Sequence, residues 1–146
     1  MPLLDMQHSV NGLVMGSPTL YRLDDVSGMG VGPIGDEKKY GIGGAAGYRW
    51  GRERRRGNLV TFTGAIVAPG DPAAAYAALE ALRTAWDVSG TLGTPDATVN
   101  WIRKMPGKAE VAAAGRPRTL DAPTRQLILG LVPFVATFEC RMPVSG

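Results

Sequence analysis

The chain has few of the residues that most enzyme mechanisms use. It contains one cysteine, Cys140, and one histidine, His8. A single cysteine excludes an internal disulfide framework. One histidine and one cysteine are also too few for the common zinc sites or for a nucleophile, base and orienting group acting together. We therefore expect no catalytic residue, no metal and no cofactor, and a protein that is not an enzyme.

Neither of these two residues lies in a pattern that indicates chemistry. His8 belongs to an unpatterned segment, Met1 to Val10, and we expect it at the surface. Cys140 lies in an apolar segment, where cysteine usually acts as a small buried hydrophobic residue. The acidic pairs Asp24–Asp25 and Asp36–Glu37 are expected to be solvated, since adjacent residues of an extended chain point to opposite faces.

Long apolar runs and aromatic residues are also scarce. No apolar run approaches the roughly 20 residues of a transmembrane helix, so we expect no membrane insertion. The first residues lack a basic segment followed by an apolar block, so we expect no signal peptide. With a net charge of +3 and only three Phe, three Trp and four Tyr, the chain lacks the dense basic stripe and stacking aromatics typical of nucleic-acid-binding domains.

Glycine and proline, in contrast, are abundant. The 146 residues include 20 glycines and 11 prolines, which favours many turns and short strands over long helices. The chain is 45% hydrophobic and 20% charged, which excludes a wholly disordered protein. This length is typical of one domain, so we expect residues 1–146 to form a single domain.

One strand and one helix have clear signatures in the middle of the chain. The segment Asn58 to Ala68 alternates and is rich in β-branched residues, which predicts a strand. Asp71 is a good helix N-cap and Pro72 suits the first helical position. The spacing predicts a helix over about 72–87 with one apolar face, formed by Ala75, Leu79, Leu82 and Trp86.

Further strands are expected on both sides of this helix. They cover Gly12 to Gly16, Leu20 to Val26 at an edge, Thr98 to Lys104, Ala109 to Arg116 with a continuation over Arg118 to Ala122, and Leu127 to Arg141. In the last strand the apolar positions change parity near Pro133, which predicts a bulge or kink. The order of strands, one helix and more strands predicts an α+β fold with mostly antiparallel pairing.

A long glycine-rich segment, about 28–57, has little apolar surface of its own. Residues 28–51 hold nine of the glycines. A segment of this length without a core is usually functional or disordered, and we expect an exposed arm or an extended hairpin. Ordering each residue costs about 1–2 kcal/mol, so we expect the arm to pack against a neighbouring subunit.

Two glycine patterns in this arm resemble nucleotide-binding loops only by letter. Gly30 to Gly35 matches GxGxxG and Gly41 to Ala46 matches GxGxxA. A dinucleotide site needs a buried strand before the glycines and a helix after them. Pro33 inside the first match and the charged residues after it do not fit that context, so we interpret both as loop.

A basic and aromatic cluster is the one notable group of the arm. Three interpretations remain open: a solvated loop, a subunit contact that uses arginine and tryptophan, or a contact with a phosphate backbone. We favour the subunit contact. The candidate interface residues are Tyr40, Tyr48, Arg49, Trp50, Arg52, Arg54, Arg55 and Arg56.

The order of these features resembles the N-terminal domain of a distal tail protein of long, flexible-tailed phages. The matching segments are Asn11 to Gly16, Tyr21 to Gly28, Gly43 to Gly47, Gly57 to Gly64, Asp71 to Trp86, Ala114 to Arg118 and Phe134 to Glu139. The resemblance covers about Asn11 to Glu139, and it rests on the order of the segments, since each one is short and common.

This resemblance implies a structural virion protein with a tail-tube-like fold, either a β-sandwich or a split barrel with one helix. It implies a minor tail protein of the tail tip or baseplate that forms a homohexameric ring at the distal end of a non-contractile tail. The ring would join the tail tube protein to the tip or hub protein and surround the channel through which DNA passes. The protein would then be found in the virion, and in the host cytoplasm during assembly.

The resemblance has one departure and two alternatives. Such proteins often carry a second, C-terminal domain that holds receptor-binding parts, whereas the sequence stops at Gly146 soon after the last expected strand, and this departure puts a direct role in holding them in doubt. The first alternative is another ring-forming tail protein, either a tail tube protein or an adaptor. The second is a small nucleic-acid-binding module that uses the arginine cluster.

Overall fold

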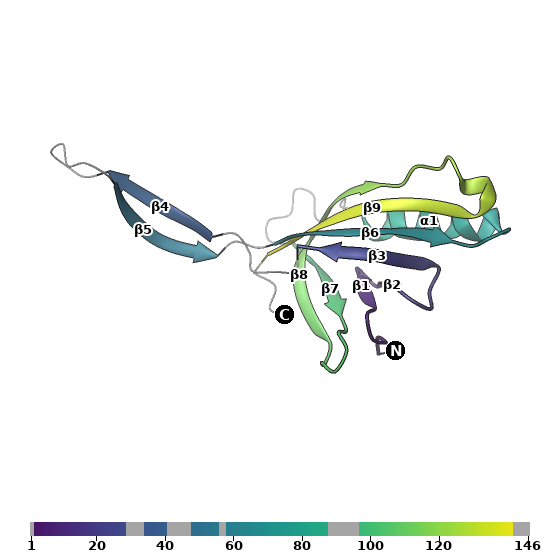
Figure 1. The fold of residues 1–146 in the computed structure, drawn as a ribbon, viewed down its shortest axis with the longest axis horizontal. Coiled ribbons are helices and arrows are strands. Elements are labelled where there is room, and N and C mark those ends of the chain that lie inside the picture. The colour runs from purple at the N-terminus through teal and green to yellow at the C-terminus, as the bar shows by residue number, and fades with distance from the viewer. Residues whose placement is uncertain (1, 29–33, 41–47, 56–57, 88–96, 142–146) are drawn as a thin grey trace.

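The computed structural model describes residues 2–28, 34–40, 48–55, 58–87 and 97–141. For 34–40 and 48–55 it describes the backbone alone. The elements are one α-helix, one short 3-10 helix and nine strands (Figure 1): β1 (His8–Val10), β2 (Leu13–Met15), β3 (Tyr21–Ser27), β4 (Ile34–Tyr40), β5 (Tyr48–Arg55), β6 (Leu59–Val67), α1 (Pro72–Ala85), β7 (Val99–Arg103), β8 (Val111–Asp121), η1 (Leu127–Leu129) and β9 (Leu131–Cys140).

Seven of the strands form one antiparallel sheet with the order β2-β1-β7-β8-β9-β6-β3. The sheet does not close into a barrel, because β2 and β3 lie at its two ends without a ladder between them. The predicted α+β fold, with mostly antiparallel strands and one helix, is confirmed. The predicted edge strand at Leu20 to Val26 is also confirmed, since β3 lies at one end of the sheet.

Helix α1 forms where the capping and spacing signals predict it. The Asp71 side chain accepts a hydrogen bond from the Ala74 backbone N–H at 3.1 Å, and Pro72 is the first helical residue. The helix ends at Ala85, two residues before the predicted end. It lies against β6 and β9 (Figure 1), and its buried face includes the predicted residues Ala75, Leu79 and Leu82. The fourth predicted residue, Trp86, is the C-cap of the helix and is also buried.

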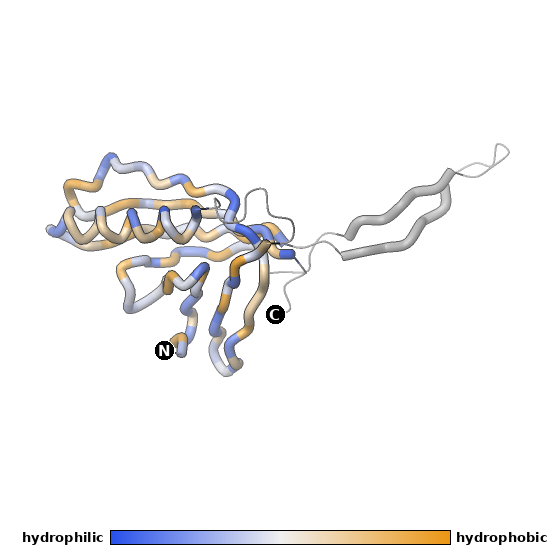
Figure 2. The backbone as a smooth tube through the Cα atoms, turned by 180° about the vertical axis from the view of Figure 1, so that it is seen from behind, coloured by the Kyte–Doolittle hydropathy of each residue, from blue (hydrophilic) through white to orange (hydrophobic). Residues whose placement is uncertain are grey.

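The core lies between the helix and the inner face of the sheet. Along β9 the buried residues alternate with exposed ones, from Val132 to Cys140. Aromatic rings fill the centre: Phe62 meets Trp86 and Trp101 in edge-to-face contacts with centroids 5.9 and 5.7 Å apart. Hydrophobic and hydrophilic residues alternate along α1 and the strands of the sheet in Figure 2. This pattern places a single core under one helix.

The predicted bulge at Pro133 is wrong. The pairing of β6 with β9 runs without a shift from Val67–Leu131 to Leu59–Glu139. The parity changes earlier, because residues 127–129 form the 3-10 turn η1 and Gly130 follows in the left-handed conformation, with φ of +79°. Pro133 is accommodated because pairing with β8 ends at Val135, so the proline lies beyond that ladder.

The glycine-rich arm contains a separate two-stranded sheet. Strands β4 and β5 pair antiparallel, with Tyr40 opposite Tyr48 and Ile34 opposite Arg55, and the register shifts between Asp36 and Lys38. The hairpin projects away from the seven-stranded sheet in Figure 1. The expected hairpin is therefore present, whereas residues 29–33, 41–47 and 56–57 of the arm lie outside the described residues.

Candidate functional site

The hairpin brings most of the candidate interface residues together. Tyr40 ends β4, while Arg56 lies outside the described residues. The other six lie on β5, at positions Tyr48, Arg49, Trp50, Arg52, Arg54 and Arg55. In the register, Lys38 is opposite Trp50 and Lys39 is opposite Arg49. The predicted role of these residues in subunit contact stays a prediction.

The two strands of the hairpin differ in charge. Strand β5 carries four arginines and a single acidic residue, Glu53. Strand β4 carries Asp36 and Glu37 together with Lys38 and Lys39. The basic character of the arm therefore belongs to β5. In the two-stranded sheet each strand has the other as its sole described neighbour, so the outer edge of β5 has no ladder within the described part of the chain.

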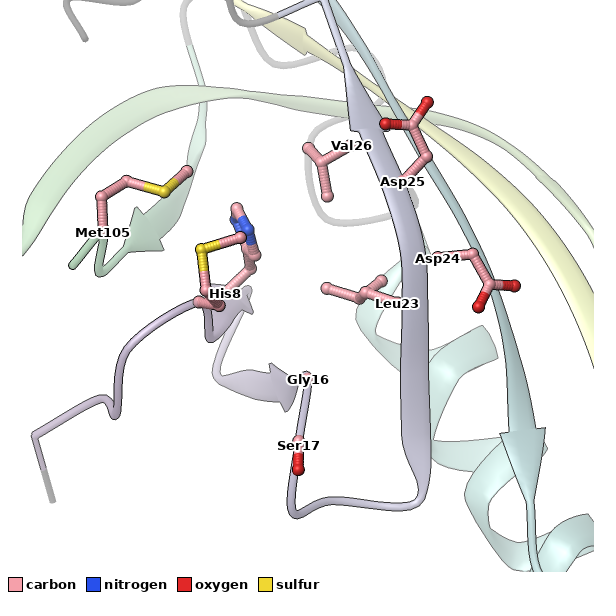
Figure 3. A pocket seen from close by; sticks show the side chains of 9 residues that line it. His8, Gly16, Ser17, Leu23, Asp24, Asp25, Val26 and Met105 are labelled. Carbon is pink, nitrogen blue, oxygen red and sulfur yellow. The ribbon is translucent and has the colours of Figure 1, made fainter.

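The end of the main sheet offers a second feature, the free edge of β3. Its one strand neighbour in the described structure is β6. A hollow of about 320 Å³ lies on the inner side of this edge, facing β1 (Figure 3). Leu23 and Val26 point from β3 into the hollow, toward His8 and Met105. The complete lining is Met6, His8, Gly16, Ser17, Leu23, Asp24, Asp25, Val26 and Met105.

Two carboxylates lie on the outer face of this strand. Both Asp24 and Asp25 are exposed, as expected, and Figure 3 shows their side chains pointing away from the hollow. The expectation that they face opposite sides is wrong, because the register with β6 shifts between Leu23 and Asp25. Such a bulge adds one residue, so that two consecutive side chains share a face. The sequence contains a sign of this bulge, because the spacing between apolar positions changes from two residues (Tyr21 to Leu23) to three (Leu23 to Val26).

A second hollow of about 320 Å³ lies on the outer face, beside these carboxylates. Its apolar part comes from β9 and the loop before it, with Pro123, Leu131, Pro133 and Val135, and its lining includes the carboxylate residues Asp24 and Asp121. The remaining lining residues are Arg22, Thr63, Gly64, Ala65 and Phe134. Strand β3 is thus flanked by hollows on both faces.

The charges on this outer face are partly engaged. Arg22 Nε donates to Asp24 Oδ1 at 2.9 Å, and Arg22 Nη2 donates to Asp24 Oδ2 at 3.3 Å. Arg118 Nε donates to Glu139 Oε2 at 2.9 Å. Asp25 and Asp121 have no such partner among the residues whose side chains the structure describes. The outer face therefore keeps acidic groups available.

His8 is not at the surface, so the sequence-based expectation is wrong. It lies on β1, is 1% exposed, and accepts a hydrogen bond at Nδ1 from Trp101 Nε1 at 3.1 Å. Burial, together with the positive charge of Arg103, lowers the pKa of His8 to about 4. The imidazole is therefore neutral near pH 7 and acts as a buried acceptor. This arrangement is structural, because β1 brings His8 beside β7, which is distant in the sequence.

Cys140 is buried, as expected. It is 3% exposed at the end of β9, and burial raises the pKa of its thiol to about 11, against the opposing effect of Arg103. The nucleophile in cysteine chemistry is the thiolate, so a thiol held protonated in the core is inert. Arg103 itself is 3% exposed and its guanidinium lies 5.1 Å from the centroid of the Trp101 ring, a cation–π geometry.

The described residues show neither a cluster of metal ligands nor a membrane-spanning helix. They contain no group of three or more His, Cys, Asp or Glu that could hold a metal ion. None of the described helices has both the length and the apolar character to cross a membrane. The Gly30 to Gly35 pattern overlaps strand β4, which begins at Ile34, whereas a dinucleotide site needs a helix N-terminus after the glycines.

Comparison with solved structures shows a likeness of fold. No protein-family model matches the sequence, and no curated protein matches it. The structure is similar to the crystal structure of the SPP1 Dit (gp 19.1) protein, described as a paradigm of the hub adsorption apparatus in phages that infect Gram-positive bacteria. The TM-score is 0.63 at 15% identity, over 96% of this chain and 51% of that chain.

This likeness confirms the expected resemblance to a phage distal tail protein at the level of the fold. The chain spans about half the length of the solved protein that it matches. The match covers nearly all of this chain.

Proposed function

We propose that this chain is a structural protein of a phage tail that forms a ring at the distal end of a long, non-contractile tail. The observation that carries this proposal is the likeness of its fold to SPP1 Dit over 96% of the chain. The coarse conclusion, a phage tail component, rests on that likeness. The ring, its position and its symmetry are the finer parts of the proposal.

In this ring, each copy contacts the next through two different surfaces. A contact of this kind is heterologous, and it closes into a ring when the rotation between copies divides a full turn. The hairpin of β4 and β5 is the natural candidate for one surface, because two strands alone are marginally stable in water. The described part of the chain supplies this hairpin with no further strand. We expect a hexamer, with a central channel through which DNA passes.

The partners follow from this position. One face of the ring would meet the tail tube protein and the other the tip or hub protein. The protein would be part of the virion, and of the host cytoplasm during assembly. A role without catalysis is part of the same proposal, and it is supported by the inert states of Cys140 and His8, the chain's one cysteine and one histidine.

Electron microscopy of the purified protein, with light scattering to measure its mass, tests the proposal. We expect single or double rings with six-fold symmetry and a central channel. Long stacks of rings would instead identify a tail tube protein, since tube subunits polymerise. Particles without rotational symmetry would contradict a ring protein of any kind.

DNA binding separates the nucleic-acid alternative from the ring. If the arginines of β5 bound a phosphate backbone, the logarithm of the affinity would fall linearly with the logarithm of salt concentration, with a slope set by the number of phosphates contacted. We expect weak binding of duplex DNA without such a steep slope. A steep slope that is lost when Arg52 and Arg54 are changed to alanine would favour the alternative.

A further inference from the structure

We infer that the free edge of β3 is the docking site for strand β5 of a second copy of this chain. The contact would extend the seven-stranded sheet of one copy by the hairpin of the next. This inference rests on the proposed function, since it needs several copies in one assembly. It deepens that function by naming the surface on which the arm docks.

Strands β3 and β5 each have one edge without a hydrogen-bonded neighbour in the described structure. In the described structure β3 has a single strand neighbour, β6, and β5 has a single strand neighbour, β4. An exposed edge presents unpaired backbone N–H and C=O groups, and it readily accepts a further strand. Pairing β5 with β3 would satisfy both edges at once. It would also give the hairpin the third strand that a stable sheet needs.

Strand length favours β3 over the other end of the sheet. Strand β3 has seven residues and β5 has eight. The carbonyl oxygen of Tyr21, the first residue of β3, already accepts the Gly16 N–H, so the edge that can pair lies beyond Tyr21. The opposite end of the sheet is β2, which has three residues. A three-residue edge offers few ladder hydrogen bonds. Strand β3 is therefore the better partner for a strand of this length.

Charge favours β5 over β4 as the strand that docks. The bulge in β3 places Asp24 and Asp25 together on the outer face. Strand β5 brings four arginines and one glutamate, whereas β4 has equal numbers of acidic and basic residues. Asp24 is held by Arg22, so Asp25 is the carboxylate that is available to a guanidinium. Arginine binds carboxylates through two parallel hydrogen bonds, which fixes orientation as well as adding energy.

The surface beside β3 fits the same occupant. The outer hollow combines apolar residues of β9, among them Leu131 and Val135, with the carboxylates of Asp24 and Asp121. Val135 is 42% exposed. A strand that carries Trp50 between arginines matches such a surface, because interface hot spots are enriched in tryptophan and arginine. Apolar contact and charge pairing would thus act together.

The occupant is a second copy and not the same chain. The hairpin of one chain leaves the sheet close to the end of its own β3 and projects away from it (Figure 1). Within one chain, the described ladders join the hairpin strands only to each other. A neighbouring copy can present its hairpin along β3 without reversing that direction.

Disulfide trapping tests this placement. One cysteine replaces Asp25 on β3, and a second replaces Arg52 or Arg54 on β5. The native Cys140 is buried and does not interfere. After mild oxidation we expect the double variants to form a ladder of covalent multimers on a non-reducing gel. Single variants should stop at the dimer. A matched control carries Glu80→Cys, on the exposed side of α1, in place of Asp25→Cys, and should give no ladder.

The results distinguish a wrong placement of β5 on β3 from a wrong proposed function. Symmetric rings without a ladder would overturn the placement of β5 on β3 and leave the proposed function intact. A disulfide formed within a monomer would also overturn the placement, since it would put the hairpin on its own chain. A protein that forms neither rings nor covalent multimers would overturn both the placement and the proposed function.

Charge reversal gives an independent readout. We expect Asp25→Arg to raise the concentration needed for half-assembly about tenfold, because it places like charges across the contact. Adding Arg52→Asp or Arg54→Asp to the same chain should restore part of the loss. The matched reversal Glu80→Arg should have little effect. Equal effects of Asp25→Arg and Glu80→Arg, or no rescue by either aspartate, would overturn the inference.

Discussion

The burial and hydrogen bonding of single core residues depend on partners that are distant in the sequence. His8 is buried because β1 pairs with β7, which places its ring beside Trp101 with centroids 5.9 Å apart. Its Nδ1 atom accepts the indole N–H of that tryptophan. Burial and the nearby Arg103 then lower its pKa to about 4. The neutral imidazole is thus required by the fold, and it links stability to pH.

The pH dependence of stability follows with a definite sign. Below its usual pKa of 6.5, His8 binds a proton in the unfolded chain but not in the folded one, down to about pH 4. The contribution of His8 is complete above pH 6.5, and it is lost as pH falls toward 4, by about 1.4 kcal/mol per pH unit. Denaturant unfolding between pH 7 and pH 4.5 measures this slope.

A variant separates His8 from the acidic groups that also titrate in this range. His8→Asn keeps an oxygen that can accept the Trp101 N–H but does not titrate. We expect a clearly shallower decline in the free energy of unfolding of His8→Asn below pH 6.5 than in that of the unchanged chain. Parallel curves for the two proteins would contradict the burial of a neutral His8.

Secondary structure elements were predictable where their signals are local. The helix α1 has its cap, its first-turn proline and its apolar spacing within a few residues of one another, so its extent and buried face were predicted. Strand β1 was missed because its three residues, His8 to Val10, are all buried and show no alternation. The parity change before β9 was seen but was placed at Pro133, because a 3-10 turn leaves no distinct pattern in three leucine-type residues.

The candidate site was predictable in part for the same reason. The arginines and aromatic residues of β5 form a visible cluster, and the alternating β3 pattern indicated an edge strand. The shared face of Asp24 and Asp25 was missed, because a bulge depends on the register with β6. The hollow beside them is lined by residues of β3, β6, β8 and β9. No local sequence pattern indicates that these four strands meet there.

The N-cap of α1 gives the first prediction for an element. Asp71→Ala removes the acceptor of the Ala74 N–H, and we expect it to lower the free energy of unfolding by about 1 kcal/mol. Asp71→Asn retains a capping oxygen and should cost much less. Urea denaturation of the three proteins measures the difference. Equal losses for the two variants would show that the cap does not stabilise the helix.

The turn before β9 gives the second prediction for an element. At Gly130 a β-carbon would meet the carbonyl oxygen of Ala68, in addition to the strain of a φ of +79°. Gly70 has a similar φ, +72°, with no atom within 4 Å of its would-be β-carbon. We expect Gly70→Ala to cost about 1–2 kcal/mol from φ alone, and Gly130→Ala to cost roughly 1–3 kcal/mol more. Thermal or urea unfolding compares them, and equal costs would contradict the close approach at Gly130.

At the scale of the whole molecule, the described residues form a seven-stranded sheet with a core and a separate two-stranded hairpin. Every buried apolar residue of the described core belongs to the body formed by the seven-stranded sheet, its helix and their connections. The hairpin is held by one ladder, and its strands are rich in charge. Such a segment gains stability chiefly from a partner, which agrees with a ring in which each copy orders the arm of the next.

Limited proteolysis tests this division. Trypsin cleaves after arginine and lysine, which are concentrated in β4 and β5. We expect cleavage in the hairpin to be at least about tenfold slower in the assembled form than in the form dissociated by dilution, because cleavage requires a segment that can open locally. Mass spectrometry of the fragments identifies the sites. Equal rates in the two forms would place the hairpin outside the subunit contact.

The proposed position in the tail is the central claim, and cryo-electron microscopy of phage particles that contain the chain tests it most directly. We predict a six-fold ring of this fold at the distal end of the tail tube, with an open channel along its axis. A tail in which the chain is absent from that end, or in which it repeats along the length of the tube, would contradict the claim.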